Sequence, residues 1–290
     1  MRSVAAGGVR AAVRRTPTCV FSHTGPPTFS DGHAADRFVE IGSLTKVVTG
    51  TALTRMAASG VLSLDDPVER WLPAAPGTGI TLLHLAEHTS GLPRLPPGRH
   101  SRRDPYASFD RHALDQLLSR LDTLATRPAG TGEEYSNLGY AVLGAALTAA
   151  SEMTYEELVT AYVLRPLGIT EVAVNPDPGR RLPAPGLLGR PRRPWTMDGA
   201  ILPAGGLWAT PRAAADLVVR LLLERRLGDP APSWQTSGPL LWHNGATRHA
   251  SLFAGAMDDG RWVLTHRLNA APDDTDRAGI DILRAGAVSE

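Results

Sequence analysis

The chain has 290 residues, 42% of them hydrophobic and 20% charged, a composition typical of a globular protein with a sizeable core. Its formal net charge of +1 gives no support for nucleic-acid binding or for an acidic partner. Cys19 is the only cysteine, which excludes a disulfide within the chain, and no apolar run is long enough to span a membrane. Because arginines interrupt the amino-terminal residues, no secretory signal is visible, and we expect a cytoplasmic protein that contacts neither membrane nor nucleic acid.

The first part of the chain starts with a short β-prone run and then becomes helical. Residues 19–22 favour a strand, a turn rich in glycine and proline follows, and a helix is expected from Ser43 to a stop at Gly60. Capping residues and apolar spacing predict further helices at residues 65–72, 82–87, 111–121, 137–150 and 154–164. Residues 93–108 and 175–195 are rich in proline, glycine and arginine, and we expect long surface loops there, serving as lids or mobile segments.

The last third of the chain returns to strands. Thr210 and Pro211 start a helix that is expected to reach Arg225. Two β-prone runs, residues 250–257 and 261–267, flank an Asp-Asp-Gly turn and predict a hairpin, and a final helix is expected near residues 276–287.

Strands at both ends of a chain can share one antiparallel sheet, with the helical middle as an insertion beside it. We therefore expect an α+β fold, an α/β sandwich in which an antiparallel sheet is flanked by helices, plus a mainly helical inserted lobe. The expected body comprises residues 1–62 together with 198–290, and the expected lobe comprises residues 63–197. A cleft between the two is the expected place for a functional site.

Lys46 is the most informative single residue, because the other 29 of the 30 basic residues are arginine. Arginine stays protonated in proteins, whereas a lysine amine can lose its proton when it is desolvated. Lys46 also lies three residues after Ser43, so a helix beginning at Ser43 brings its amine to the serine hydroxyl. A serine alcohol needs an adjacent base to become a nucleophile, and a desolvated amine can supply one.

Two further motifs could complete such a site. Tyr135-Ser136-Asn137 stands at the start of an expected helix, where a phenol can transfer protons and an amide can hold both the lysine and a substrate carbonyl. Taken alone, a Tyr-x-Asn motif is more often a helix cap, with Asn137 as the capping residue. His243-Asn244-Gly245 is expected to open an edge strand and to place a backbone N–H against a bound acyl group, although His-Asn-Gly also fits an ordinary turn.

Together these motifs resemble those of the penicillin-binding-protein and class C β-lactamase superfamily of active-site serine enzymes. The order is the same: Ser-x-x-Lys, then Tyr-x-Asn, then Lys or His followed by x-Gly. Residues 88–93 (His-Thr-Ser-Gly-Leu-Pro) and 203–208 (Pro-Ala-Gly-Gly-Leu-Trp) are similar to family segments too, and the resemblance extends from about Phe38 to the carboxyl terminus.

The resemblance implies a role for each matching residue. Ser43 would be the nucleophile, Lys46 its activating partner, and Tyr135 the group that takes and returns the proton. Asn137 would orient Lys46 and bind substrate, and His243 stands where many relatives have lysine. The backbone N–H groups of Ser43 and Ala246 would form the oxyanion hole, with Gly245 beside the substrate. Neither a metal ion nor another cofactor is implied.

This chain departs from the family in two respects. It has a shorter amino-terminal strand region and a shorter span between the second and third motifs, which predicts a more open acyl pocket. The histidine at position 243 is more typical of the esterase, amidase and peptidase relatives than of efficient β-lactamases, because histidine is mostly neutral at pH 7.

His84, Glu87 and His88 match the H-x-x-E-H motif of inverted zinc proteases, which leaves zinc-dependent hydrolysis as a remote alternative. The main hypothesis is a serine hydrolase that cleaves an ester, amide or β-lactam of a small acyl substrate through an acyl-enzyme on Ser43. A transacylase that passes the acyl group to an amine or alcohol would use the same first half-reaction. A non-catalytic binding protein is disfavoured because all three motifs are intact.

Overall fold

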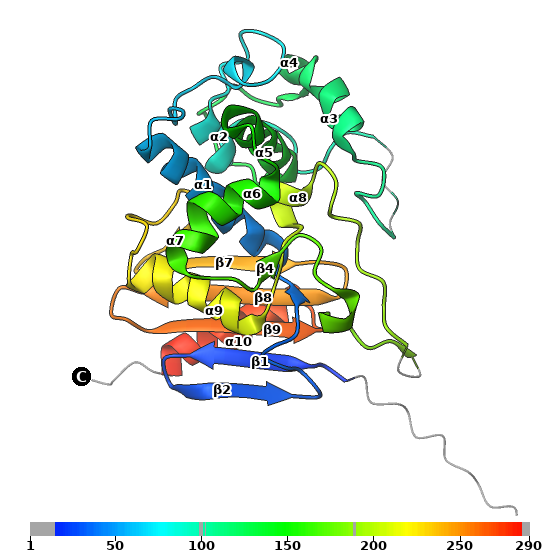
Figure 1. Cartoon of the computed structure of the whole chain (residues 1–290), viewed down its shortest axis with the longest axis vertical. Helices are drawn as coiled ribbons and strands as arrows, with labels where there is room; N and C mark the ends of the chain where they lie inside the picture. The colour runs from blue at the N-terminus through cyan, green and yellow to red at the C-terminus, as the bar shows by residue number, and fades with distance from the viewer. Residues whose placement is uncertain (1–14, 99–100, 102, 188–189, 286–290) are drawn as a thin grey trace, which may run out of the picture.

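The computed structural model describes residues 15–98, 101, 103–187 and 190–285, and its largest feature is a six-stranded antiparallel sheet. The strand order is β2-β1-β9-β8-β7-β6, so strands from both ends of the chain are neighbours, as expected (Figure 1). The strands are β1 (Thr18–Ser22), β2 (Gly25–Ser30), β6 (Gln235–Ser237), β7 (Leu240–Ala246), β8 (Ala250–Met257) and β9 (Trp262–Leu268).

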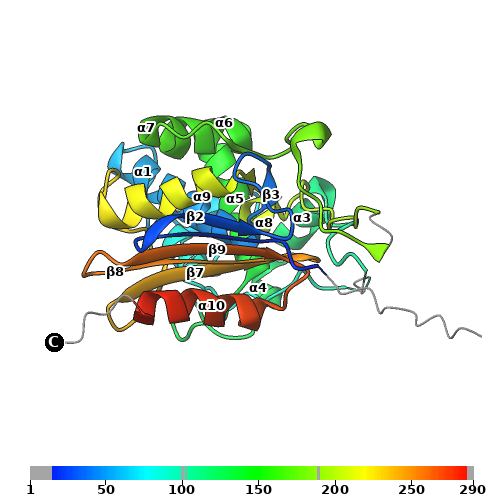
Figure 2. The ribbon, with the colours of Figure 1, turned by 90° about the horizontal axis from the view of Figure 1, so that it is seen from below.

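Helices cover both faces of this sheet, which makes the body a sandwich. Helix α10 (Pro272–Ala285) lies on one face, and α9 (Pro211–Val218) lies on the other (Figure 2). A second, three-stranded sheet has the order β3-β5-β4 and joins β3 (Val39–Glu40), β5 (Trp208–Ala209) and β4 (Val172–Ala173).

The remaining helices are α1 (Thr45–Ala58), α2 (Leu82–Ala86), α3 (Arg111–Leu118), α4 (Leu121–Leu124), α5 (Asn137–Ser151), α6 (Tyr155–Val159), α7 (Arg165–Leu167) and α8 (Leu202–Gly205). Most of them lie on the side of the sheet that carries α9 (Figure 2), and α2, α3, α4 and α5 extend beyond β7 (Figure 1). Short 3₁₀ turns occupy Gly42–Leu44, Val68–Arg70 and Pro178–Arg180, and π-type turns occupy Thr160–Leu164 and Val219–Leu223. No helix among the described residues is long and apolar enough to cross a bilayer.

Where local chemistry defines an element, the structure agrees with the sequence. The Asp-Asp-Gly turn joins β8 to β9, with Gly260 at φ +90°, and Thr154 forms the expected capping box with Glu157 at the start of α6. The helix predicted over residues 65–72 is only the 3₁₀ turn Val68–Arg70, and the one predicted over 111–121 ends at Leu118 before α4 begins. The last helix begins at Pro272, four residues before the predicted start, and its predicted end at Ala287 lies outside the described residues.

The glycine- and proline-rich segment after residue 22 was expected to be a turn, and this expectation was wrong. Residues Gly25–Ser30 form β2, which pairs with β1 and is an edge strand of the sheet among the described residues. Pro26 and Pro27 lack a backbone N–H, and an edge strand tolerates them because one side of it makes no ladder hydrogen bonds. All six residues of β2 are exposed, so no alternation of apolar and polar residues marks the strand in the sequence.

One hydrophobic cluster runs from the inner face of the sheet into the helices, and α1 lies at its centre. Ten of the 14 residues of α1 are buried, among them Lys46 and Thr49. Helix α5 approaches α8 closely at Gly144, where an added Cβ would lie 2.0 Å from Cγ of Pro203. Because α1, α5 and α8 pack this tightly, Lys46, Asn137 and the segment around Ala204 are fixed relative to one another.

Candidate active site

Ser43 lies at the junction between the small sheet and the central helix. It is the middle residue of the turn Gly42–Leu44, which leads directly into α1. Gly42 has a φ of +51°, a left-handed conformation that favours glycine, and the N–H of Ile41 donates to the carbonyl of Leu207 at 3.2 Å. The side chain of Ser43 is half-buried, and the turn directs it to the amine of Lys46.

Lys46 is completely buried, and its amine contacts three oxygen atoms. Nζ lies 2.6 Å from the carbonyl oxygen of Ala204, 2.8 Å from Oδ1 of Asn137 and 3.3 Å from Oγ of Ser43. No described carboxylate forms an ion pair with it. Burial, and then the positive charge of Arg94, hold the pKa of the Lys46 amine well below its ordinary value of 10.5. The neutral amine is thereby favoured.

The ring of Tyr135 packs against this amine. The Lys46 Nζ lies 4.7 Å from the centre of the Tyr135 ring, and the phenol is hydrogen-bonded to the Ser43 side chain. Burial raises the pKa of the Tyr135 phenol to about 12, against smaller lowering effects of the Ser43 hydrogen bond and the Arg94 charge. The phenol therefore keeps its proton at neutral pH.

Asn137 begins α5 and links Lys46 to a loop. Its Oδ1 accepts from Lys46, and its Nδ2 donates to the Tyr106 hydroxyl at 2.8 Å. The N-cap of α5 is Ser136, whose side chain accepts from the N–H of Gly139, so capping does not account for Asn137. The amide of Asn137 is thus occupied on both sides and held in one orientation.

The two predicted long loops meet next to Tyr106. Its ring packs edge-on against Trp195, with centroids 6.0 Å apart, and Oδ2 of Asp104 accepts from both the N–H and the hydroxyl of Thr196. The Trp195 indole N–H donates to the carbonyl of Arg103 at 3.1 Å. The loops therefore form a connected wall that reaches the site through the Tyr106–Asn137 hydrogen bond.

His243 is buried and is not exposed to the charge of a substrate. Its ring is completely buried, with Nδ1 2.6 Å from the carbonyl oxygen of Asn244, and Nε2 has no partner among the described residues. Burial, and secondarily the Lys46 charge, lower the pKa of His243 to about 4. The imidazole is therefore uncharged at neutral pH.

The end of β7 lies directly against the turn that carries Ser43. A Cβ on Gly245 would lie 2.2 Å from the carbonyl oxygen of Ile41 and 3.3 Å from the Ser43 nitrogen, so only glycine allows this approach. A Cβ on Gly42 would lie 2.8 Å from the Ala246 nitrogen. The backbone nitrogens of Ser43 and Ala246 therefore both lie where the Gly42–Leu44 turn contacts the end of β7, one on each of these two segments.

His243 was expected to open an edge strand, and this detail was wrong. His243 to Ala246 form the second half of β7, and among the described residues they pair with β8 alone, because β6 begins at Gln235, opposite Trp242. The open edge at His243 to Ala246 thus exists, but at the end of the strand. The short β6 was not visible in the sequence because only three residues pair.

The residues of the H-x-x-E-H motif are engaged elsewhere. Nδ1 of His84 accepts from the N–H of Thr81 in a capping box, and α2 ends at Ala86. His88 lies beyond the helix at φ +60°, where its Nδ1 accepts from the N–H of Ser136 and its ring packs 4.4 Å from that of Tyr135. The two imidazoles therefore do not share a helical face, so the arrangement gives the zinc alternative no support.

Sequence reasoning missed three contributors to the site. The carbonyl of Ala204 carries no sequence signature beyond the segment in which it lies. Tyr106 is the only aromatic residue in the loop 93–108, a signal that could have marked it. Arg94 follows the His-Thr-Ser-Gly-Leu-Pro segment, and its guanidinium lies 5.1 Å from the centre of the Tyr135 ring with its side chain exposed. Among the described residues Arg94 has no ion-pair partner.

Comparison with solved structures assigns the fold to a class. A solved beta-lactamase/D-alanine carboxypeptidase from Yersinia pestis shares the fold with a TM-score of 0.76 at 20% identity, over 93% of this chain and 92% of its own. A class C beta-lactamase from Rhodobacter sphaeroides has a TM-score of 0.71 at 19% identity, over 93% of each chain. The described residues thus have the fold of class C β-lactamases and D-alanine carboxypeptidases, as the sequence predicted.

A model of the Beta-lactamase family matches residues 2–266, and the chain belongs to that family. It is 34% identical to the D-alanyl-D-alanine-carboxypeptidase/endopeptidase AmpH of Escherichia coli K12 over 185 residues, which are 61% of this chain and 46% of AmpH. It is also 34% identical to the esterase EstB of Burkholderia gladioli over 183 residues, 58% of this chain and 46% of EstB. The chain spans about half the length of these curated relatives.

Proposed function

We propose that this protein is a serine hydrolase that cleaves an ester or amide of a small acyl compound through an acyl-enzyme on Ser43. The observation that carries this proposal is the environment of Lys46. Its amine is buried and forms no ion pair with a described carboxylate. The carbonyl oxygen of Ala204 and the amide oxygen of Asn137 each accept one N–H hydrogen bond from it. In the neutral amine the remaining lone pair faces Oγ of Ser43, which is the arrangement that a base for the serine hydroxyl needs.

The chemistry follows from these positions. As Oγ of Ser43 attacks the acyl carbon, its proton moves to Nζ of Lys46, and the negative charge that forms on the acyl oxygen is stabilised by the N–H groups of Ser43 and Ala246. Tyr135, which holds its proton at neutral pH, protonates the leaving group and recovers a proton from the Lys46 ammonium. Water then attacks the acyl-enzyme, and the same groups return the proton to Ser43.

The charges at the site favour a substrate that carries a carboxylate. His243 is buried and uncharged at neutral pH, so it offers no charge to a substrate anion. Arg94 is exposed, has no described ion-pair partner, and lies over the ring of Tyr135. We therefore propose that Arg94 binds the carboxylate of an acyl-amino-acid or peptide-like substrate, taking the part that a lysine at position 243 would play.

Covalent labelling tests the proposed nucleophile. A fluorophosphonate probe should label the wild-type protein at Ser43, located by peptide mapping, and Ser43→Ala should abolish the label. The same substitution should lower turnover of an activated ester by roughly four or more orders of magnitude while leaving the thermal unfolding midpoint unchanged. Ser108→Ala, at an exposed loop position, is the matched control and should label normally. Labelling of Ser43→Ala at another serine would overturn the assignment.

Acyl transfer to an amine or alcohol remains the second candidate, because the loop wall at Tyr106 and Trp195 can restrict the access of water to the acyl-enzyme. Product analysis separates the two reactions. Hydrolysis predicts that the free acid dominates when an ester is supplied with millimolar amine, whereas transfer predicts the amide as the main product. The name of EstB as an esterase and that of AmpH as a carboxypeptidase support the hydrolytic outcome.

A further inference from the structure

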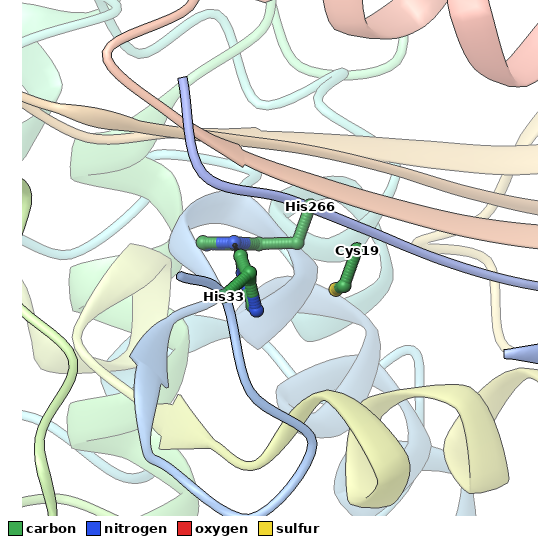
Figure 3. A group of neighbouring side chains, drawn as sticks. All are labelled: Cys19, His33 and His266. Carbon is green, nitrogen blue, oxygen red and sulfur yellow. Dashed lines mark hydrogen bonds between the residues drawn. The ribbon is translucent and has the colours of Figure 1, made fainter. Parts of the chain in front are cut away.

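Three side chains that take no part in the proposed reaction meet beneath the large sheet. Cys19 and His266 are register partners in β1 and β9, so their side chains leave the sheet on the same face. His33 comes from the loop after β2 and reaches them from below (Figure 3). One ligand atom from each residue lies within 4.8 Å of the other two, the one such group of metal-ligand side chains found among the described residues.

All three side chains are buried, and both imidazoles are neutral. Cys19 and His266 are fully buried, and His33 is 6% exposed. Burial lowers the pKa of His33 to about 4, and burial together with the neighbouring His33 lowers the pKa of His266 to about 3. Neutral imidazole is the form that binds metal ions.

The outer nitrogen of each ring faces a backbone carbonyl. Nε2 of His266 lies 3.3 Å from the carbonyl oxygen of Glu40, and Nδ1 of His33 lies 3.3 Å from that of Ala34. Histidines that ligate metals typically donate their second ring N–H to such an acceptor, which fixes the tautomer and directs the other nitrogen at the ion. Here the other nitrogens, Nε2 of His33 and Nδ1 of His266, face each other at 2.9 Å.

We propose that Cys19, His33 and His266 form a binding site for one thiophilic divalent cation such as Zn²⁺, with a fourth position left to water. Soft thiolate and imidazole ligands select Zn²⁺ over Mg²⁺ or Ca²⁺. In tetrahedral zinc sites the ligand atoms lie about 3.3–3.7 Å apart, so the two imidazoles have to separate by roughly half an ångström.

Binding of the metal ion releases one proton from the protein. Without metal, the N–H of Ala34 donates to Nδ1 of His33 at 2.9 Å, and the Nε2 proton of His33 fills the bond to His266. On binding, the proton of His33 moves to Nδ1, which gives up the hydrogen bond from the N–H of Ala34 and donates to the carbonyl of Ala34 instead, while Nε2 becomes a ligand. Burial raises the pKa of Cys19 to about 12, so the thiol enters protonated and releases its proton to solvent as the sulfur–metal bond forms.

The proposed metal site contacts the strand that leads to the nucleophile. His266 holds the carbonyl of Glu40 at the end of β3, and Ser43 follows three residues later. A metal ion here would connect β1, β9 and the loop of His33 to the strand that positions Ser43. We therefore assign it a structural part, separate from the reaction.

Metal titration of the full chain tests the proposal. The protein, reduced and stripped with a chelator that is then removed, should bind one Zn²⁺ and release about one proton. Co²⁺ in its place should give tetrahedral d–d bands and a near-ultraviolet sulfur-to-cobalt charge-transfer band. At a hundredfold excess over the dissociation constant, Zn²⁺ should raise the unfolding midpoint by about 4–5 °C.

Conservative variants locate the ligands. Cys19→Ser should remove the charge-transfer band and weaken Zn²⁺ binding by at least about tenfold, and His33→Gln should weaken binding similarly while keeping the band with residual Co²⁺. His84→Ala is the matched control and should bind as the wild type does. Absence of stoichiometric binding would show that the three groups form a metal-free hydrogen-bonded cluster and would overturn the proposal. Binding that survives in Cys19→Ser but is lost in His84→Ala would overturn it in favour of the H-x-x-E-H motif.

Discussion

At the scale of single residues, Lys46 should be irreplaceable by arginine although arginine stands at every other basic position. Guanidinium stays protonated and cannot take the serine proton, so Lys46→Arg should lower kcat/KM nearly as much as Lys46→Ala, roughly 10²- to 10⁴-fold. The wild-type pH profile of kcat/KM should rise as the base deprotonates and reach its plateau well below pH 10.5. Near-normal turnover of Lys46→Arg would show that only positive charge is needed there.

Arg94 offers a second residue-scale prediction, on substrate choice. Arg94→Gln should lower kcat/KM about tenfold for an ester that carries a free carboxylate, mainly through KM, because a charge-assisted hydrogen bond is lost. For the neutral methyl ester of the same compound the change should stay within about twofold. Arg120→Gln, an exposed arginine on α4's N-terminal side, serves as the control. An equal loss on both esters would assign Arg94 to the folding of the loop instead of to recognition.

The sequence revealed those residues of the site whose chemistry is rare in this chain. Lys46 was visible because it is the only lysine, and its spacing from Ser43 is that of one helical turn. The Ala204 carbonyl was not, since any residue can supply a backbone acceptor and only the packing of α8 on α1 directs it at the amine. His243 was expected to be a polar group beside the substrate; that it is buried and uncharged depends on the sheet around it.

At the scale of elements, the contact between β7 and the Ser43 turn depends on Gly245. The added methyl in Gly245→Ala would meet the carbonyl oxygen of Ile41 at 2.2 Å, so the strand has to move away from the turn. We expect a loss of about 1–3 kcal/mol of unfolding free energy and a fall in kcat of about two orders of magnitude, because the N–H of Ala246 moves with the strand. Denaturant titration and turnover of an activated ester measure the two effects.

Gly77→Ala is the control for this prediction. Gly77 has a φ of +76° and open space around it, so the substitution strains only its own backbone, by about 1–2 kcal/mol. Stability should fall while kcat stays the same. If Gly245→Ala also lowered stability without lowering kcat, the close approach of β7 to the Ser43 turn would matter for folding and not for turnover.

Elements that the sequence predicted well carry their own local signals. Caps and glycine stops marked α1 and α6, and a turn residue marked the β8–β9 hairpin. The strands β2 and β6 were missed because their stability comes from pairing with neighbours and not from their own residues. Such pairing joins residues far apart in the chain, and it also brought Cys19 to His266 without any signal in either segment.

At the scale of the whole molecule, the expected sheet and helical lobe share one hydrophobic cluster. The boundaries at residues 62 and 198 remain a prediction, as does a cytoplasmic location. Because the core is continuous, the side chains of the site are buried by contacts from both the sheet and the helices. Their burial then makes the stability of the entire fold depend on their protonation.

His88 and His243 should make the protein sensitive to mild acid. Burial lowers the pKa of His88 to about 3 and that of His243 to about 4, in both cases with a further lowering from Lys46 and, for His88, from His243 and Arg94. Above the ordinary histidine pKa of 6.5 both imidazoles are neutral in the folded and unfolded chains, so they add no pH dependence. Below it the unfolded chain binds protons that the folded chain excludes, and each group lowers the free energy of unfolding by up to ~1.4 kcal/mol per pH unit.

Denaturant titrations at pH 7, 6 and 5 measure this slope, and one substitution isolates a single group. His88 has a φ of +60°, which asparagine tolerates, and an asparagine carbonyl can accept from the N–H of Ser136 as Nδ1 does. His88→Asn should therefore fold but lose stability less steeply between pH 6.5 and 5, whereas His112→Gln, at an exposed position, should keep the wild-type slope. If His88→Asn kept that slope as well, His88 would have to accept a proton in the folded state, and the packing around Tyr135 would be looser than the structure has it.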